Sequence, residues 1–378
     1  MKILYVSHLH PPKDAPLANM GGMQRVSMQL VRELQIRPDI EIMTVIQQAP
    51  WNGIKWRTAL FLIRMKFKLP QIVKEFNPDV ILFSSMVTGG LALLAGKNID
   101  TPMVTINHGR DVKMPNGFYQ NLVPKVFNAL HGVISVSEAT RAECIKRGMH
   151  PDKGIALPNG FHEMDFETGI AKDKSREIIE EKFDVNLSGK GLLLTVGRQV
   201  KRKGHDWFIR EVLPKINSEI YYLIVGDGPE HERLNGVVSN SPNTHKIILA
   251  GRQPDELLKH AYAAADIFIM PNIPVSGDME GFGIVLLEAN LASTFAIASD
   301  LEGIKDVIKD GVNGFKIPVH DSKTFARKIN EVLASNPGEF GKQSSKYVKE
   351  FFSWNSVADR YISYLKEIIE NYKSAASR

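Results

Sequence analysis

Residues 280–288 read EGFGIVLLE, in which two glutamates enclose a Gly-Phe-Gly turn and four consecutive aliphatic residues. The glycines fit a loop and the aliphatic run fits a helix, so Gly281, Phe282 and Gly283 are predicted at a helix N-terminus. Backbone N–H groups at such a position can bind phosphate oxygens or a sugar hydroxyl. The stretch therefore predicts a loop-to-helix turn that can bind a ligand.

The two glutamates require partners of their own. Glu288 falls inside the apolar run, where a buried and unpaired carboxylate costs several kcal/mol. That cost is offset if the carboxylate accepts two hydroxyl hydrogen bonds, as adjacent ribose hydroxyls would supply. Glu280, in the loop, can accept hydroxyls of a sugar in the same way. The alternative is that both are structural carboxylates that cap the helix.

On both sides of this stretch, short aliphatic runs alternate with amphipathic stretches over the 378 residues. Continuous aliphatic strands separated by helices predict parallel sheets that are covered on both faces. The strand-like runs include KILYVSH, DVILFSS and PMVTINH in the first half, and GLLLTVGR, IYYLIVGDG and ADIFIMP in the second. We therefore predict an α/β fold of two doubly wound domains, with a boundary near the turn signal Pro158-Asn159-Gly160.

The composition, 43% hydrophobic and 24% charged, is ordinary for a soluble globular protein. The single cysteine, Cys144, excludes an internal disulfide framework and a cysteine-based metal cluster. The start, MKILYVSH, has an apolar run too short for a signal peptide, and no stretch approaches the ~20 apolar residues of a membrane span. We therefore expect a cytoplasmic protein.

The net charge of +5 is unevenly distributed. Residues 1–160 hold 19 Lys and Arg against 11 Asp and Glu, whereas the remainder holds 28 against 31. A basic first half indicates an anionic partner, such as a phosphate, a nucleic acid or an anionic membrane. The alternative is a basic surface that is merely solvated.

Three further motifs stand where strands are predicted to end, which is where open parallel sheets bind ligands. Gly21-Gly22 would let backbone N–H groups approach an anion at the start of a helix, or would be a plain turn. Arg198 and Lys203, in GRQVKRKG, suit a diphosphate, although such a basic run can also be a solvated face. His108, in NHGRD, can donate or accept a proton near a ligand, or can be a structural histidine.

Together these motifs resemble the retaining, nucleotide-sugar-dependent glycosyltransferases of family 4, which have the GT-B fold. EGFGIVLLE resembles the Glu-x7-Glu signature of that family, and GRQVKRKG resembles its Gly-Arg…Lys-Gly phosphate clamp. Other segments match in order over nearly the whole chain: GGMQR, NHGRD, SVSEAT, PNGF, GDGPE, ADIFIMP and the terminal FSW. One departure is Leu291-Ala292-Ser293, where the family commonly has Ala-Cys-Gly; it concerns packing behind the site.

The resemblance implies two Rossmann-like domains that face each other across a cleft, with a C-terminal helix returning to the first domain. Residues 1–162, with the helix at about 356–378, would form the N-terminal acceptor-binding domain. Residues 163–355 would form the C-terminal nucleotide-sugar-binding domain. One face of the terminal helix is apolar, with Val357, Tyr361, Tyr364, Leu365 and Ile368.

The resemblance also implies a donor site in the second domain. Arg198 and Lys203 would bind the donor diphosphate, and Glu288 would bind the ribose. Glu280, together with the amides of residues 281–283, would bind the transferred sugar, and Arg252 would face the base.

Two further roles follow for the first domain. Gly22 would approach the donor phosphates or the acceptor. His108 would contact the sugar near the reacting centre, so that His108 and Glu280 are the candidate catalytic residues. No side chain is assigned as a nucleophile, because the resemblance implies that the leaving phosphate helps to deprotonate the acceptor on the same face.

The implied activity is the metal-independent transfer of a hexosyl unit from a UDP- or GDP-sugar, with retention, to a glycan or lipid-linked acceptor in cell-envelope polysaccharide or glycolipid synthesis. No Asp-x-Asp triplet occurs in the chain, so neither a metal nor another cofactor is expected, and no nucleic-acid partner. The alternatives are a nucleotide-sugar epimerase or hydrolase on the same fold, or a catalytically silent nucleotide-sugar-binding protein.

Residues 51–74, WNGIKWRTALFLIRMKFKLPQIVK, interleave six cations with aromatic and aliphatic residues and contain no acidic residue. This pattern suits a segment that lies in an anionic membrane interface, and hence a peripheral protein at the inner face of the membrane. The alternative is an ordinary helix that packs Leu60, Ile63 and Phe67 into the first domain, with its cations in water.

Overall fold

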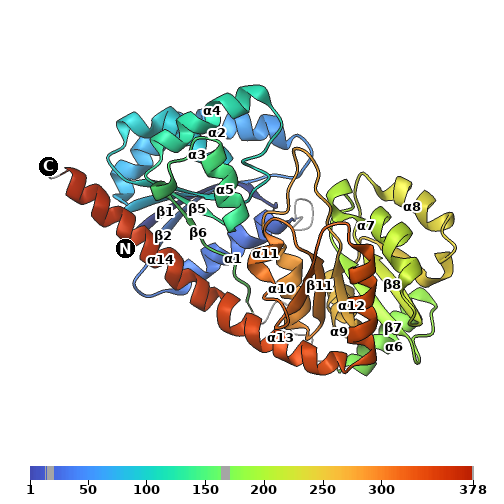
Figure 1. The fold of residues 1–378 in the computed structure, drawn as a ribbon. Helices are drawn as coiled ribbons and strands as arrows, with labels where there is room; N and C mark the ends of the chain where they lie inside the picture. The colour runs from blue at the N-terminus through green and yellow to red at the C-terminus, as the bar shows by residue number, and fades with distance from the viewer. Residues whose placement is uncertain (13, 15–20, 163–170, 377–378) are drawn as a thin grey trace. The chain divides into compact units, whose positions relative to one another are not determined.

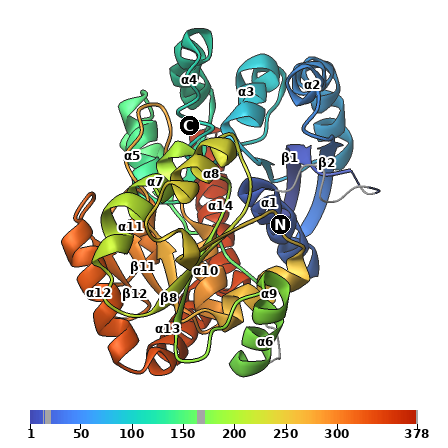
Figure 2. The same ribbon diagram turned by 90° about the vertical axis from the view of Figure 1, so that its right-hand side faces the viewer.

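The structure, a computed structural model, describes residues 1–12, 14, 21–162 and 171–376. The chain divides into two compact units, Met1–Phe161 with Phe352–Arg378, and His162–Phe351. Each unit contains a six-stranded parallel sheet flanked by helices (Figure 1 and Figure 2). The predicted α/β class with two doubly wound sheets is confirmed. Residue 163, the expected start of the second domain, lies outside the described residues.

The sheet of the first unit has the strand order β2-β1-β3-β4-β5-β6. Its strands are β1 (Lys2–His10), β2 (Glu41–Gln48), β3 (Val80–Phe83), β4 (Met103–Asn107), β5 (Gly132–Ser135) and β6 (Gly154–Ala156). Inner strands such as β3, with the sequence VILF, are buried on both faces, which explains their unbroken aliphatic sequences. The edge strand β2 is only partly covered.

Helices cover both faces of this sheet. They are α1 (Gly22–Ile36), α2 (Ile54–Phe76), α3 (Met86–Ala95), α4 (Gly117–Ala129), α5 (Glu138–Lys146) and α14 (Trp354–Ala376), with short 3₁₀ turns at Gly96–Asn98 and Pro151–Lys153. The chain runs outward from β1 to β2 and then back past β1 to β3. Right-handed crossovers therefore place α1 on the opposite face from α2 to α5 (Figure 1).

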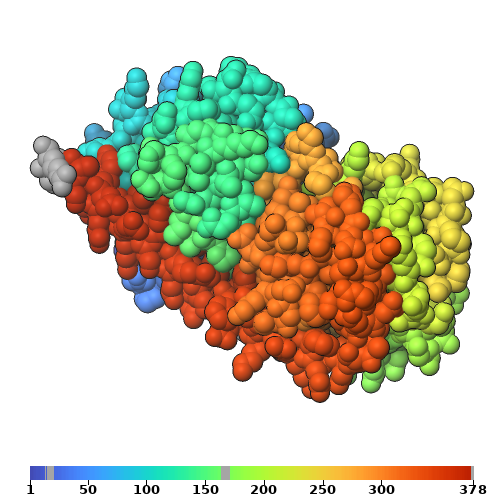
Figure 3. All heavy atoms as spheres, viewed as in Figure 1, coloured from blue at the N-terminus to red at the C-terminus, as the bar shows by residue number. Residues whose placement is uncertain are grey.

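Helix α14 packs against α1 and remains on the surface of the first unit (Figure 3). At its start, Trp354 is buried and its Nε1 donates to Oε1 of Gln29 at 3.0 Å. Tyr364 donates its hydroxyl hydrogen to the carbonyl of Lys153 at 2.8 Å. A Cβ at Gly160 would lie 2.5 Å from the Trp354 ring, so the glycine of the PNGF turn is required by this close approach.

The sheet of the second unit has the order β12-β11-β10-β7-β8-β9. Its strands are β7 (Gly191–Val196), β8 (Ile220–Val225), β9 (Ile247–Gly251), β10 (Ile267–Met270), β11 (Phe295–Ser299) and β12 (Gly314–Ile317). A core of aliphatic and aromatic side chains packs one face of this sheet against Phe208, Leu234 and Phe325.

The helices of the second unit also lie on both faces of its sheet. They are α6 (Lys172–Phe183), α7 (His205–Trp207), α8 (His231–Ser239), α9 (Asp255–Ala264), α10 (Ile284–Leu291), α11 (Ile304–Val307), α12 (Ser322–Ala334) and α13 (Pro337–Phe352). Shorter turns occupy Lys201–Lys203, Phe208–Val212, Leu213–Lys215 and Thr244–Lys246. The chain moves outward from β7 to β9 and then crosses back to β10, so α9 to α11 lie opposite α7 and α8.

Candidate active site

Each sheet has a point at which the strand order reverses, and open parallel sheets bind ligands beyond the carboxyl ends of the strands at such a point. In the second unit it lies between the neighbouring strands β7 and β10. The loop after β7 carries Arg198, Arg202 and Lys203, and the loop after β10 carries Asn272 and Glu280. The tertiary structure thus brings together two segments that are far apart in the sequence.

Glycine fixes the path of the loop after β7. Gly204 has a φ of +66°, and a Cβ there would lie 1.9 Å from the carbonyl oxygen of Pro271. Only glycine fits this approach, which brings the turn Lys201–Lys203 against the loop after β10. Lys203 is 7% exposed, so its ammonium is directed into the protein.

Glu280 receives three hydrogen bonds on one carboxylate oxygen. Its Oε2 accepts from Arg202 Nη1 at 2.6 Å, Lys203 Nζ at 2.7 Å and Asn272 Nδ2 at 3.0 Å. Arg202 Nε also lies 3.3 Å from Oδ2 of Asp278. Among the described residues, neither Oε1 of Glu280 nor Oδ1 of the buried Asn272 has a hydrogen-bond partner. Two acceptors therefore remain for ligand hydroxyls.

The charges of this cluster stabilise the ionised form of Glu280. Burial raises the pKa of Glu280, but the charges of Lys203 and Arg202 outweigh it and lower the pKa to about 2. Burial also lowers the pKa of Lys203; the carboxylate of Glu280 opposes this shift, and the positive charge of Arg202 adds to it. An additional anion beside Lys203, such as a diphosphate, would therefore stabilise the ammonium.

Arg198 lies at the carboxyl end of β7 with an exposed side chain, and no described residue pairs with it. Arg252 is also exposed, but it follows the edge strand β9, which is separated from β7 by β8. The structure thus brings Lys203 and Glu280 into contact and places Arg198 on the same edge, whereas Arg252 lies two strands away.

The Gly-Phe-Gly segment forms the loop that leads into α10, as predicted. Gly283 has a φ of +87° at the start of the helix, where no side chain of the described residues caps it. Phe282 is buried. The N–H of Glu280 donates to Oε2 of Glu302 at 2.6 Å, and a Cβ at Gly303 would lie 2.1 Å from the carbonyl oxygen of Gly281. Glu302 and Gly303 therefore fix the position of this loop.

Glu288 lies on α10 and is 4% exposed. The hydroxyl of Tyr262, on α9, donates to its Oε2 at 2.6 Å. Part of the cost of burying this carboxylate is therefore offset by a protein hydroxyl. The ribose contact expected of Glu288 stays a prediction.

In the first unit, the strand order reverses between β1 and β3. His108 follows the next strand, β4, and its Nε2 donates to the carbonyl of Ser84 at 3.0 Å. Its backbone N–H donates to Oδ1 of Asp111 at 2.8 Å. Burial lowers the pKa of His108, although Asp111 opposes the shift. Because a carbonyl only accepts, Nε2 carries the hydrogen of this bond, and Nδ1 is the nitrogen that can accept a proton or a hydrogen bond.

Two further histidines, His8 and His10, lie at the carboxyl end of β1. His8 and His10 are buried, and burial lowers the pKa of each to about 4. His10 Nε2 and the hydroxyl of Tyr5 lie 2.8 Å and 2.6 Å from Oγ of Ser27. Gly22 is the exposed first residue of α1, at an N-terminus that no described side chain caps.

Several residues of these clusters were not predicted from sequence. The basic run predicts a role for Lys203 and not for its neighbour Arg202, and Asn272 and Tyr262 carry no motif of their own. The only available signal was positional, since Asn272 follows the strand-like run ADIFIMP and His8 ends KILYVSH.

The cationic segment 51–74 forms most of α2, and its arrangement contradicts the packing alternative. Leu60, Ile63 and Phe67 are 55%, 58% and 71% exposed, and the helix is anchored instead through Met65, Leu69 and Val73. No helix in the described parts of the chain is both long and apolar enough to cross a membrane. In those parts, no cluster of three or more His, Cys, Asp or Glu side chains is arranged to hold a metal ion.

Two family profiles match the chain. Residues 20–163 match "Glycosyltransferase Family 4", and residues 177–351 match "Glycosyl transferases group 1". Among curated relatives, an uncharacterized glycosyltransferase of Methanocaldococcus jannaschii is 27% identical over 64% of this chain and 60% of the relative. The amylovoran biosynthesis glycosyltransferase AmsK of Erwinia amylovora is 25% identical over 69% of this chain and 64% of the relative. Both alignments thus span less than two thirds of the relative's length.

Solved structures share the fold. HepE of Anabaena, in complex with UDP, superposes with a TM-score of 0.75 at 17% identity, covering 97% of this chain and all (100%) of the other. Sucrose-phosphate synthase of Thermosynechococcus elongatus gives a TM-score of 0.77 at 18% identity, covering 98% and 100%.

Proposed function

Since the chain belongs to glycosyltransferase family 4 and has the GT-B fold, we propose that it transfers a hexosyl unit from a nucleotide-diphosphate sugar to a glycan or lipid-linked acceptor. The transfer retains the anomeric configuration and serves cell-envelope polysaccharide or glycolipid synthesis. The second unit binds the donor, and the first unit binds the acceptor.

The observation that carries this proposal is the cluster around Glu280. Lys203 and the exposed Arg198 both follow β7 and can contact a diphosphate, and among the described residues Oε1 of Glu280 and Oδ1 of Asn272 are acceptors without partners. A site with cations for phosphate beside acceptors for hydroxyls suits the two ends of a sugar-diphosphate bond. Buried acceptors also discriminate against an analogue that lacks the hydroxyl, because they are then left unpaired.

The chemistry requires stabilisation of the leaving diphosphate and a base for the acceptor. Lys203 and Arg198 supply the first in place of a metal, and no further cofactor takes part. A phosphate oxygen of the leaving group takes the proton of the acceptor hydroxyl, and that hydroxyl attacks the sugar on the same face. His108, whose Nδ1 has no partner among the described residues, contacts the sugar near the reacting carbon.

The relatives suggest two donor classes. Solved structures of HepE contain UDP and UDP-glucose. A relative from Mycolicibacterium smegmatis, 25% identical over 71% of this chain and 70% of its own length, is a GDP-mannose-dependent mannosyltransferase acting on a phosphatidylinositol monomannoside. We therefore propose a UDP- or GDP-hexose as donor, with Glu288 on its ribose and Arg252 facing its base.

A cytoplasmic location at the inner face of an anionic membrane completes the proposal. Helix α2 exposes cations and apolar side chains together, and each cation near an anionic surface adds about 1 kcal/mol. Wild type should sediment with anionic liposomes at low salt and be released at high salt. A variant with Arg64, Lys66 and Lys68 changed to Ser should remain in the supernatant, and equal binding by this variant would remove the membrane association.

The activity is tested by incubating the protein with a panel of UDP-, GDP- and ADP-sugars and measuring nucleotide release with and without candidate acceptors. We expect one donor to be turned over in an acceptor-dependent way, with a product of unchanged anomeric configuration by NMR. Release that is independent of acceptor would identify a hydrolase, and a changed sugar would identify an epimerase. Donor binding without turnover would identify a silent binding protein.

A further inference from the structure

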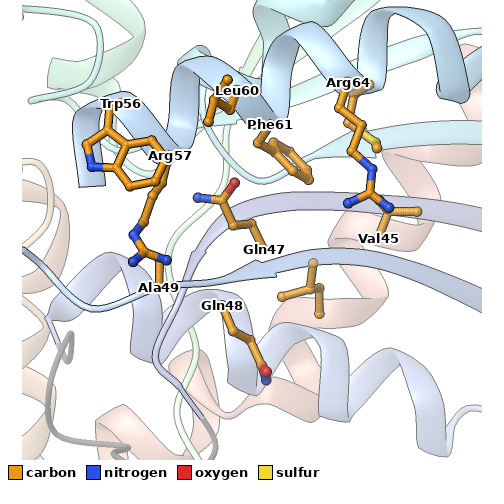
Figure 4. A pocket seen from close by; sticks show the side chains of 11 residues that line it. Val45, Gln47, Gln48, Ala49, Trp56, Arg57, Leu60, Phe61 and Arg64 are labelled. Atoms are coloured by element: carbon orange, nitrogen blue, oxygen red, sulfur yellow. The ribbon is translucent and has the colours of Figure 1, made fainter. Parts of the chain in front are cut away.

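A groove of about 390 Å³ separates the edge strand β2 from helix α2 (Figure 4). Residues 45–49 form its floor, and α2 contributes Trp56, Arg57, Leu60, Phe61, Arg64 and Met65. Helix α2 is anchored through Met65, Leu69 and Val73, whereas Trp56 and Leu60, which line the groove, are more than half exposed.

The polar lining of the groove offers donors to an anion. Arg57 and Arg64 extend from α2 toward β2 on either side of Gln47 (Figure 4). Neither guanidinium pairs with an acidic group among the described residues, and residues 42–74 contain no Asp or Glu. The amide Nε2 of Gln47 is buried and has no hydrogen-bond partner in the described part of the chain. The guanidinium of Arg57 lies over the Trp56 ring, 5.0 Å from its centroid. Two guanidinium groups that have no acidic partner among the described residues, together with the Gln47 amide, therefore line the groove, a combination suited to phosphate or carboxylate.

An apolar stripe borders the groove along α2. Trp56, Leu60, Ile63 and Phe67 follow one another at intervals of four, three and four residues, and each is more than half exposed. Trp56 and Leu60 belong to both the stripe and the groove. A small anion in the groove would leave this stripe in water, whereas the acyl chains of an amphiphile would cover it.

We propose that this groove binds the phosphate headgroup of an anionic phospholipid, whose acyl chains lie along the stripe. The inference rests on the membrane association included in the proposed function and gives it a defined lipid site. Arg57 and Arg64 supply the charge, and Gln47 donates to a headgroup oxygen.

The groove lies beside the functional edge of the first sheet, which suggests what lipid binding there would do. In the parallel pairing of β1 and β2, Gln48 lies opposite His10, and the N–H of Ala49 donates to the carbonyl of His10 at 2.9 Å. The groove therefore ends at the carboxyl edge of the first sheet, the edge that also carries His108. A lipid bound there holds the acceptor-binding edge of this unit at the membrane surface.

The test uses monomeric dihexanoyl-phosphatidylglycerol below its critical micelle concentration, without nucleotide sugar, and follows tryptophan fluorescence. We expect saturable binding whose signal is lost in Trp56→Phe. The double variant Arg57→Gln/Arg64→Gln should weaken binding about tenfold or more, because it removes charge-assisted contacts. Its matched control, Lys97→Gln/Lys125→Gln, removes the same charge from exposed positions of the first unit that lie outside both the groove and α2, and it should stay within about threefold.

A third variant, Gln47→Met, keeps the charge and should weaken binding by about threefold or more, since a single neutral hydrogen bond is lost. Circular dichroism confirms that each variant is folded. If both double variants lose the same affinity for the lipid, binding comes from unspecific electrostatic attraction and the groove is not the site. Equal binding of dihexanoyl-phosphatidylcholine, or displacement by inorganic phosphate at the same concentration as the lipid, would also overturn it.

The liposome experiment separates this inference from the proposed function. Wild type that sediments with anionic liposomes but does not bind the monomeric lipid contradicts the groove and leaves the membrane association intact. Acceptor-dependent transfer without lipid binding likewise contradicts the groove alone.

Discussion

Nζ of Lys203 lies 2.7 Å from Oε2 of Glu280, a residue 77 positions further along the chain. Both groups are buried, and their contact joins the loops that follow β7 and β10. The pair therefore connects the cation expected at the donor diphosphate with the carboxylate expected at the transferred sugar. A change in either partner should affect both ends of the donor.

The first prediction concerns the phosphate contacts. Lys203→Ala and Arg198→Ala should each weaken donor binding and turnover about 10- to 100-fold, since losing a charge-assisted contact costs roughly 1.5–3 kcal/mol. Calorimetry with the preferred donor and steady-state kinetics measure the two effects. Arg198→Ala should leave the melting temperature unchanged, because its side chain is exposed and unpaired among the described residues. Wild-type kinetics in both variants would remove the diphosphate clamp.

A second prediction assigns a positioning role to Arg202, which contacts Glu280 and Asp278. Arg202→Ala should lower kcat/KM about tenfold. It should also move the acidic limb of the pH–rate profile upward, because the pKa of Glu280 rises when one of its two cations is lost. Arg202→Lys should restore part of the activity.

Lys201→Ala is the matched control for this experiment. Lys201 is the exposed neighbour of Arg202, has the same charge, and pairs with no described residue. Its removal should leave both the rate and the pH profile close to wild type. If the two alanine variants behave alike, Arg202 acts only through the general positive charge of the loop.

The third prediction concerns metal. Activity should survive saturating EDTA, because we propose that Arg198, Lys203 and the N-terminus of α10 neutralise the leaving diphosphate. Rates are compared before and after dialysis against the chelator. Complete loss of activity that Mg²⁺ or Mn²⁺ restores would show that a metal stabilises the leaving group.

The fourth prediction concerns acid stability. His205 is buried, both of its ring nitrogens lack partners among the described residues, and burial lowers its pKa to about 3. Below the ordinary pKa of about 6.5, the unfolded chain binds a proton that the folded chain does not. His205 therefore makes stability fall as the pH drops from about 6.5 toward 3, by at most about 1.4 kcal/mol per pH unit.

His205→Leu should remove this contribution and flatten the dependence of the free energy of unfolding on pH. Urea unfolding at pH 7, 6 and 5 measures the slope. His245→Gln, which removes an exposed histidine of the same unit, should leave the slope unchanged. An undiminished slope in His205→Leu would mean that His205 does not titrate as described.

The sequence by itself determined the elements and the family. Unbroken aliphatic runs predict buried parallel strands because both faces of such a sheet are covered, and the strands formed where these runs occur. Gly204 and Gly160 are required because other parts of the chain pack closely against them, and both belong to motifs that can be recognised in the sequence. The order and spacing of motifs around EGFGIVLLE identified the family, because these features are local and can be recognised in the sequence without the tertiary structure.

Only the tertiary structure decided which distant residues meet. The reversal of strand order between β7 and β10 brings Arg202 and Asn272 to Glu280, and the packing of α9 on α10 brings Tyr262 to Glu288. Hydrophobic periodicity fixes the type of an element and does not encode strand order. Helix α2 shows the same limit, because it carries apolar residues on two faces. From the sequence alone, the face with Leu60, Ile63 and Phe67 could have packed on the core. In the structure, the face with Met65, Leu69 and Val73 packs there, and Leu60, Ile63 and Phe67 are exposed.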